Sequence, residues 1–170
     1  LSCLSQTDLD YYKDKFPGKQ ITLEHVFHEN TEVKCQPGKG NYLLYHGNLS
    51  LIDNYKAVID LLNNELQNTK HKMVVAGKDP SPTLIDFIKT KPNVQLVVNP
   101  THEALDALIM QSQVCFAIAN NPSGIKLKLI NSVYRGRFIF SNEAAFVGSG
   151  LDDCVINMND FSEQLLDEYM

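Results

Sequence analysis

NYLLYHGNLSLIDNYKAVIDLLNNEL, residues 41–66, joins a short apolar run to a longer amphipathic one. Residues 41–47 are nearly continuous in apolar character, which predicts a buried strand. In residues 50–66 the apolar side chains recur with helical spacing, at Leu51, Ile52, Tyr55, Val58, Ile59, Leu62 and Leu66. A buried strand joined to an amphipathic helix is the first half of a βαβ unit, because parallel strands need such a crossover.

The same alternation continues to the end of the chain. Further strands are predicted over 71–77, 93–98, 113–119, 137–141 and 154–158. Helices are predicted over 83–89, 101–111, from 124 onward and over 160–170, with Thr101 and Asp160 as N-caps. Residues 143–150 read as a short helix or loop. Residues 41–170 are therefore predicted to form an α/β, Rossmann-like domain, with a doubly wound, mostly parallel sheet flanked by helices.

The first 40 residues are less regular and are interpreted as a linker-proximal helix and strand that pack on this domain. A helix is predicted over 5–16 with Thr7 near its start, a strand over 20–27, and a polar loop over 28–41. The chain begins on Leu1, and we expect it to be part of a longer protein.

Composition restricts the class of protein. With 44% hydrophobic residues and 21% charged residues, the 170-residue chain is typical of one soluble globular domain. The net charge of -5 argues against a nucleic-acid binder held by a general basic field. No run approaches the roughly 18–20 apolar residues of a membrane span, and residues 1–10 lack a signal-peptide core. The four scattered cysteines are expected to be reduced thiols, which favours a cytoplasmic location.

Ligands of open parallel sheets bind beyond the carboxyl ends of the strands. That rule selects five loops, at 46–50, 76–82, 98–102, 119–124 and 141–146. The fourth leads into SGIKLKLINSVYRGRF, residues 123–138. If Ser123 caps the helix, the free N–H groups of Gly124, Ile125 and Lys126 point into the crevice, as is usual for phosphate binding.

Two lysines lie at the start of this predicted helix, where the helix dipole disfavours cations. On a helical wheel Lys126 falls in the apolar sector, so it either binds a phosphate or extends to the surface as a snorkelling lysine. Lys128 lies on a polar wedge with Asn131 and Ser132, and taken alone it is interpreted as part of a solvated face.

Other chemistries find less support. His25 and His28 resemble a metal pair, but on a strand their odd spacing places them on opposite faces, so no metal is expected. His46 is either a ligand-facing residue at a strand end or an ordinary partly buried histidine. Neither GxGxxG nor GxxxxGK[ST] occurs, and no Cys or His spacing suits a nucleophile and its base.

Five segments carry a family resemblance: LSCLSQTDLDYYKDKF (1–16), YLLYHGNLS (42–50), HKMVVAGKDP (71–80), NVQLVVNPTHEALDALIMQSQVCFAIA (93–119) and SGIKLKLINSVYRGRF (123–138). In this order the chain resembles the C-terminal, donor-binding domain of GT-B glycosyltransferases of the group 1, or family 4, type, particularly bacterial mannosyl- or glucosyltransferase-like proteins. The helix ending in Gly136 before a hydrophobic strand is the strongest match.

The resemblance implies a nucleotide-sugar donor held without a metal or other cofactor. It places Gly124 and Lys126 at the donor's phosphates or sugar, with Lys128 in place of a lysine that many relatives carry before the helix. It places Asn131 at the ribose and the backbone near Val98 and Asn99 at the base. The full donor-binding set that it implies is Gly47, Asn48, Val98, Asn99, Ser123, Gly124, Lys126, Lys128 and Asn131.

The chain departs from the family at two motifs. Ser123 and Asn131 occupy the positions of Glu-x7-Glu, and the loop from Gly47 lacks the family's basic residues. Charge stabilisation of a leaving diphosphate would then rest on Lys126, Lys128 and helix N-termini.

The resemblance predicts the donor half of a cytoplasmic bacterial glycosyltransferase that moves a hexose to a glycan or glycolipid in surface polysaccharide assembly. The N-terminal acceptor domain is missing, so the isolated domain is expected to be inactive, and any peripheral membrane association would come through that domain. Two alternatives remain: a non-catalytic binding or scaffolding domain that has lost donor chemistry, and a sugar-nucleotide epimerase, which would need a carboxylate and histidine cluster.

Overall fold

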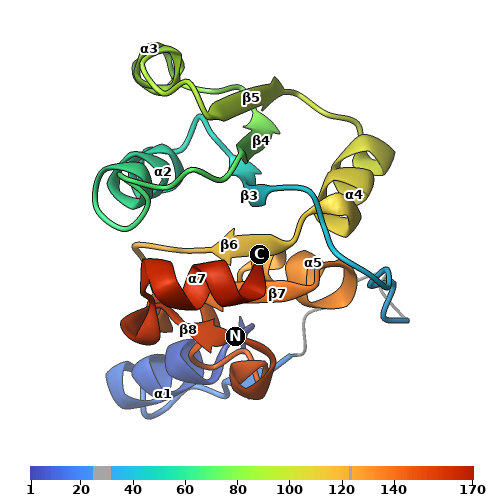
Figure 1. The fold of residues 1–170 in the computed structure, drawn as a ribbon. Coiled ribbons are helices and arrows are strands. Elements are labelled where there is room, and N and C mark those ends of the chain that lie inside the picture. The colour runs from blue at the N-terminus through green and yellow to red at the C-terminus, as the bar shows by residue number, and fades with distance from the viewer. Residues whose placement is uncertain (25–31, 123) are drawn as a thin grey trace.

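The centre of the molecule is a six-stranded parallel sheet in the order β5-β4-β3-β6-β7-β8, shown in a computed structural model of the chain (Figure 1). The structure describes residues 1–24, 32–122 and 124–170. The strands are β3 (Leu43–Asn48), β4 (Met73–Lys78), β5 (Val94–Val98), β6 (Val114–Ala117), β7 (Phe138–Ser141) and β8 (Ile156–Asn157). The predicted doubly wound α/β fold is therefore confirmed.

Helices cover both faces of this sheet, with α2 and α3 on one side and α4 and α5 on the other (Figure 1). The helices are α2 (Ile52–Asn63), α3 (Pro82–Lys89), α4 (His102–Gln111), α5 (Leu127–Arg135), α6 (Glu143–Phe146) and α7 (Glu163–Tyr169). Two short 3-10 turns, Asp152–Cys154 and Met158–Asp160, flank β8.

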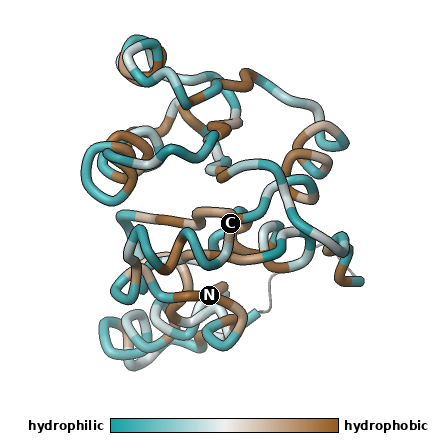
Figure 2. The backbone as a smooth tube through the Cα atoms, viewed as in Figure 1, coloured by the Kyte–Doolittle hydropathy of each residue, from teal (hydrophilic) through white to brown (hydrophobic). Residues whose placement is uncertain are grey.

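Two hydrophobic clusters divide between the faces because successive side chains of a strand point in opposite directions. Leu43 and Tyr45 of β3 pack in the cluster that contains Leu61 of α2, Leu84 of α3 and Leu166 of α7. The opposite cluster contains Leu44 of β3, Ile109 of α4 and Leu129 of α5. Figure 2 shows hydrophobic residues concentrated along the strands and hydrophilic residues on the loops between them.

The N-terminal residues form a small separate arrangement. Helix α1 (Gln6–Lys15) connects β1 (Ser2–Cys3) to β2 (Thr22–Leu23), and the two short strands pair in parallel. The predicted helix is confirmed, and part of the predicted strand 20–27 lies outside the described residues. The boundary at residue 40 stays a prediction.

Two predicted helix starts are wrong, those of α5 and α7. Helix α7 is capped by Ser162 rather than by Asp160, whereas α1 starts where predicted, with the hydroxyl of Ser5 as its cap and Thr7 in its first turn. Helix α5 begins at Leu127 with Lys126 in the N-cap position and no side-chain cap. The chain reaches α5 through Gly124 at φ +69, a conformation that glycine adopts without the steric cost of a side chain. The predicted cap of α4 by Thr101 is confirmed.

Candidate functional site

The sheet has its topological switch point between β3 and β6. From β3 the chain proceeds outward through β4 and β5, and from β6 it proceeds the other way through β7 and β8. Connections leave β3 and β6 in opposite directions at their carboxyl ends, which opens the crevice where ligands of doubly wound sheets bind. The candidate site is this crevice.

Two hollows lie at the carboxyl ends of the strands. The first, here the β3/β6 hollow, has a volume of about 300 Å³ and is lined by Leu51, Ile52, Asp53, Asn54, Ala119, Asn120, Asn121, Lys126 and Lys128. The second, here the β4/β5 hollow, has a volume of about 410 Å³ and is lined by Gly47, Asn48, Gly77, Lys78, Asp79, Asn99, Pro100, Thr101, His102 and Leu105. Five of the nine predicted donor-binding residues are thus divided between the two hollows, with Lys126 and Lys128 in the first and Gly47, Asn48 and Asn99 in the second.

Lys128 is the most highly constrained cation of the crevice. Its ammonium donates hydrogen bonds to the Tyr45 hydroxyl at 2.9 Å, to Asn54 Oδ1 at 3.0 Å and to the carbonyl of Ile118. It also lies 4.9 Å from the centroid of the Tyr45 ring, within the range of a cation–π contact. The interpretation of Lys128 as a solvated residue is therefore wrong. The side chain extends over the end of the sheet, which a helical wheel drawn from residue 124 does not show.

Burial affects the charge of this lysine. Desolvation, with the nearby Lys126 charge as a second cause, lowers the pKa of Lys128 to about 8. Among the described residues, no carboxylate is a hydrogen-bond or ion-pair partner of this ammonium. A positive charge is therefore held beside the hollow by neutral dipoles and a ring face.

Lys126 lines the same hollow in a different environment. It is partly buried at the N-cap of α5, and desolvation lowers its pKa, while the charges of Asp8 and Asp53 act in the opposite direction. Two lysines on one hollow suit an anionic ligand, because each disfavours the charged form of the other until a negative group enters.

The loops around the crevice are fixed by side-chain amides. Asn54 Nδ2 donates to the carbonyl of Asn48 at 2.9 Å, and Asn48 Oδ1 accepts from the Ser50 N–H at 3.1 Å. On the other side, Asn142 bonds both the N–H and the carbonyl of Ala119, at 3.0 and 2.8 Å. These bonds hold the segments after β3 and β6 on either side of the switch point.

The β4/β5 hollow contains two residues with positive φ, Asp79 at 47° and Asn99 at 49°. Asn99 accepts from the Asp79 N–H at 2.8 Å and donates to the Asp79 carboxylate at 3.2 Å. Non-glycine residues in this conformation are uncommon and cluster at ligand-binding turns. The structure therefore brings predicted residues Gly47, Asn48 and Asn99 together and adds Asp79, which the sequence did not single out.

The remaining predicted residues are less clearly placed. Val98 is 51% exposed at the end of β5, and Asn131 is partly buried on α5. Gly124 is partly exposed before α5 and lines neither hollow. Ser123 lies outside the described residues, so the predicted cap falls there as well. Helix α5 begins at Leu127, so the N–H groups of Gly124, Ile125 and Lys126 are not those of its first turn, and the predicted phosphate-binding N–H groups are wrong.

His46 is a buried partner of α5. Its Nε2 lies 3.0 Å from the Ser132 hydroxyl, and the residue is 3% exposed. Burial, with a contribution from the Lys128 charge, lowers the pKa of His46 to about 4. The structure therefore supports the interpretation of His46 as a buried histidine and does not support a ligand-facing role.

The described ranges offer neither a metal cluster nor a membrane-spanning helix. Residues 1–24, 32–122 and 124–170 contain no group of three His, Cys, Asp or Glu side chains that could hold a metal ion. The pair His25 and His28 lies outside them. Within the same ranges, no helix has the length and apolar character needed to cross a bilayer.

Comparisons with solved structures identify the fold. TarM superposes with a TM-score of 0.74 at 12% identity, over 99% of this chain and 35% of its own. AviGT4, described as a glycosyltransferase involved in avilamycin A biosynthesis, gives 0.68 at 13% identity, over 99% of this chain and 53% of its own. The chain has the Rossmann-like fold of GT-B glycosyltransferases.

A third matching structure was solved with ligands. A point mutant of S. aureus TarM, solved with fondaparinux, α-GlcNAc-glycerol and UDP, gives a TM-score of 0.64 at 12% identity, over 88% of this chain and 30% of its own. Our chain therefore spans about a third to a half of the length of these GT-B structures. No protein-family model matches the sequence, and a search of curated proteins found no match.

Proposed function

We propose that this chain is the donor-binding half of a glycosyltransferase and holds a nucleotide sugar, with a hexose as the transferred group and a glycan or glycolipid as the acceptor. The observation that carries the proposal is the pair Lys126 and Lys128 beside the β3/β6 hollow, at the switch point of a GT-B-like sheet. A diphosphate bound there offsets two neighbouring positive charges in one step.

The two hollows support a division of the ligand. The diphosphate is assigned to the lysine side, and the nucleoside to the β4/β5 hollow, where Asn99 and the exposed edge of β5 supply polar groups. Uridine diphosphate is the first ligand to test, because the S. aureus TarM mutant structure contains UDP.

A complete enzyme would need an acceptor-binding domain as well, since the chain spans only a part of the GT-B structures that it matches. We expect the isolated chain to bind donor and not to transfer sugar. The family 4 type, a bacterial surface-polysaccharide role, cytoplasmic location and independence of metals are parts of the same proposal. Any contact with a membrane surface is assigned to the absent domain.

A scaffolding domain without donor chemistry is the second candidate. It is favoured by Ser123 and Asn131 at the positions of the family's glutamate pair, and by the full use of the Lys128 N–H groups within the protein. The two candidates differ in whether any nucleotide binds.

Titration of the 170-residue chain with UDP, GDP and their sugars, followed by amide NMR, tests the proposal. We expect shifts in the segments around Asn48, Asn99 and Lys126, and at least a tenfold loss of affinity in Lys126→Ala. Lys89→Ala is the matched control, because it removes an exposed lysine from the last turn of α3. No shift with any nucleotide at millimolar concentration would favour the scaffold.

A further inference from the structure

The hydrogen-bond capacity of Lys128 is fully used within the protein. A lysine ammonium carries three N–H donors. Three acceptors surround this one, namely the Tyr45 hydroxyl, Asn54 Oδ1 and the carbonyl of Ile118. A phosphate oxygen can therefore receive a hydrogen bond from Lys128 only if one of these three is released.

Each acceptor belongs to a different element of the crevice. Tyr45 is in β3, Asn54 is in the first turn of α2, and Ile118 directly follows β6. One ammonium thus joins the two strands that form the switch point and the helix that follows the first of them. This contact is one of the points where the two walls of the crevice are joined, along with the hydrogen bond from Asn120 Nδ2 to the carbonyl of Asp53.

The link extends into the loop after β3. Asn54 accepts from Lys128 through Oδ1 and donates through Nδ2 to the carbonyl of Asn48 at 2.9 Å. Asn48 in turn holds the N–H and the hydroxyl of Ser50 on its Oδ1, at 3.1 and 2.8 Å. These hydrogen bonds connect the loop to Lys128 through Asn54.

We propose that Lys128 is a positioning residue: it fixes the loop from Asn48 to Asn54 through Asn54, and it supplies a fixed positive charge that an anion in the β3/β6 hollow offsets. Direct hydrogen bonds to the anion are left to Lys126 and to backbone N–H groups of the loops. The second half of the proposal rests on the proposed function, whereas the first half does not.

Few charged groups face this ammonium. Lys126 repels it from the start of α5, while Tyr45 and His46 approach it from β3, and burial keeps both of these neutral near pH 8 by raising the Tyr45 pKa and lowering the His46 pKa. Asp53 of α2 and Asp8 of α1 act on Lys126. An anion entering the hollow therefore favours the protonated form of Lys128, and binding near pH 8 takes up part of a proton.

The positioning role is tested without any ligand, by hydrogen exchange of the Ser50 amide in the 170-residue chain. In Lys128→Met and in Asn54→Ala, which removes the link and keeps the lysine, we expect exchange to be at least tenfold faster than in wild type. Lys89→Ala, which removes an exposed lysine from the last turn of α3, is the control and should leave the exchange rate within about twofold. Far-UV circular dichroism establishes that each variant is folded, and unchanged Ser50 exchange in folded Lys128→Met and folded Asn54→Ala overturns the positioning role.

The charge role is tested with UDP by calorimetry at pH 8 in buffers of different ionisation enthalpy. At pH 8, which equals its pKa, Lys128 is about half protonated before UDP binds. Wild type and Asn54→Ala should therefore take up as much as roughly half a proton per UDP. Lys128→Met should take up none from this group and bind UDP at least tenfold more weakly. Equal proton uptake in wild type and Lys128→Met overturns the charge role. If wild type does not bind UDP, the charge role and UDP as its ligand are overturned, while faster Ser50 exchange in the two variants still supports positioning.

Discussion

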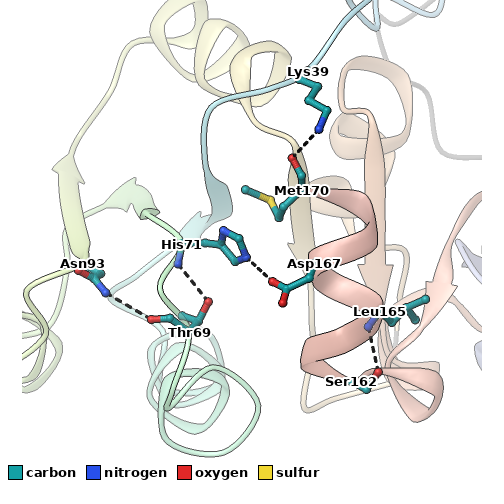
Figure 3. Close-up of polar contacts among 8 residues, drawn as sticks. All are labelled: Lys39, Thr69, His71, Asn93, Ser162, Leu165, Asp167 and Met170. Carbon is teal, nitrogen blue, oxygen red and sulfur yellow. Dashed lines mark hydrogen bonds and ion pairs between the residues drawn. The ribbon is translucent and has the colours of Figure 1, made fainter.

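The two ends of the parallel sheet use their charged side chains differently. At the amino end, His71 Nε2 lies 2.7 Å from an Asp167 carboxylate oxygen, which joins the segment before β4 to α7, and Lys39 donates to the carbonyl of Met170 (Figure 3). Arg137, just before β7, donates to the carbonyls of Gly38, Met110 and Ser112. These charges connect the chain to itself on the side away from the crevice.

At the carboxyl end the cations border a hollow. Lys128 is held by neutral acceptors, and Lys126 lies beside it at the start of α5. Removing the Lys128 ammonium from water without a carboxylate among its hydrogen-bond acceptors is costly, so its presence needs either a structural or a binding role. Charged side chains at the amino end therefore connect segments of the chain, whereas under the proposed function the charge at the carboxyl end faces a ligand.

The largest expected effect comes from breaking the carboxyl end itself. A Cβ on Gly77 of β4 would lie 1.9 Å from the carbonyl oxygen of Gly47, which is backbone and cannot turn aside. Gly77→Ala should lower the free energy of unfolding by about 3–5 kcal/mol through overpacking and strain. The matched variant Gly47→Ala meets nothing nearer than 3.7 Å and should change stability by no more than about 1 kcal/mol. Urea unfolding measures both, and similar losses in the two variants would contradict the close approach.

Low pH should destabilise the protein through the buried His46, which contacts α5. The pKa of His46 is about 4 in the folded protein, whereas its ordinary value is 6.5. Between these pH values the imidazole is protonated in the unfolded chain and neutral in the folded protein. Stability from this group is complete above pH 6.5 and falls as the pH drops toward 4, by up to about 3 kcal/mol. His46→Gln should lose that part of the pH dependence. Denaturant unfolding at several pH values measures the free energy of unfolding of wild type and His46→Gln. The same dependence on pH in both proteins would contradict a buried neutral His46.

Raising the pH above about 8 should stabilise the protein through Lys128. Its pKa is about 8 when folded against 10.5 when exposed, so between these values the unfolded chain binds more protons and stability rises with pH. From about pH 8 to about pH 10, wild type should gain up to about 2 kcal/mol relative to Lys128→Met. The exposed-lysine variant Lys89→Met should follow wild type. If the free energy of unfolding of Lys128→Met rises with pH as much as that of wild type, the Lys128 ammonium of wild type is hydrated rather than desolvated.

The sheet was predictable because its signals are local. Apolar runs separated by amphipathic helices identified the strands from residue 41 onward, and the Thr101 cap is a pattern of adjacent residues. The role of Lys128 was not predictable, because its partners Tyr45 and Asn54 lie 83 and 74 positions away in the sequence. A helical wheel shows only which side of a helix a residue faces. Lys128 lies in the first turn of α5, and its side chain extends over the end of the sheet to contact Tyr45 and Asn54.

A related limit explains the error at the start of α5. The Pro-Ser-Gly sequence predicted a helix from residue 124, yet the chain passes through a positive φ at Gly124 and enters the helix only at Leu127. A wheel drawn from residue 124 therefore gives Lys126 a helical direction, although this residue is in the extended N-cap conformation. The two lysines were identified as site residues, but the more buried of them, Lys128, was the one assigned to a solvated face.

The smallest expected effect is at the amino end. The imidazole of His71 is 27% exposed and the carboxylate of Asp167 is 71% exposed, so water and salt screen their attraction. Asp167→Asn keeps the shape of the side chain and should cost less than about 1 kcal/mol at low ionic strength and almost nothing in about 0.5 M salt. Thermal unfolding at the two salt concentrations measures this difference. A loss of several kcal/mol that persists in salt would mean that the amino end, like the crevice, depends on a desolvated charge, and the contrast between the two ends would no longer hold.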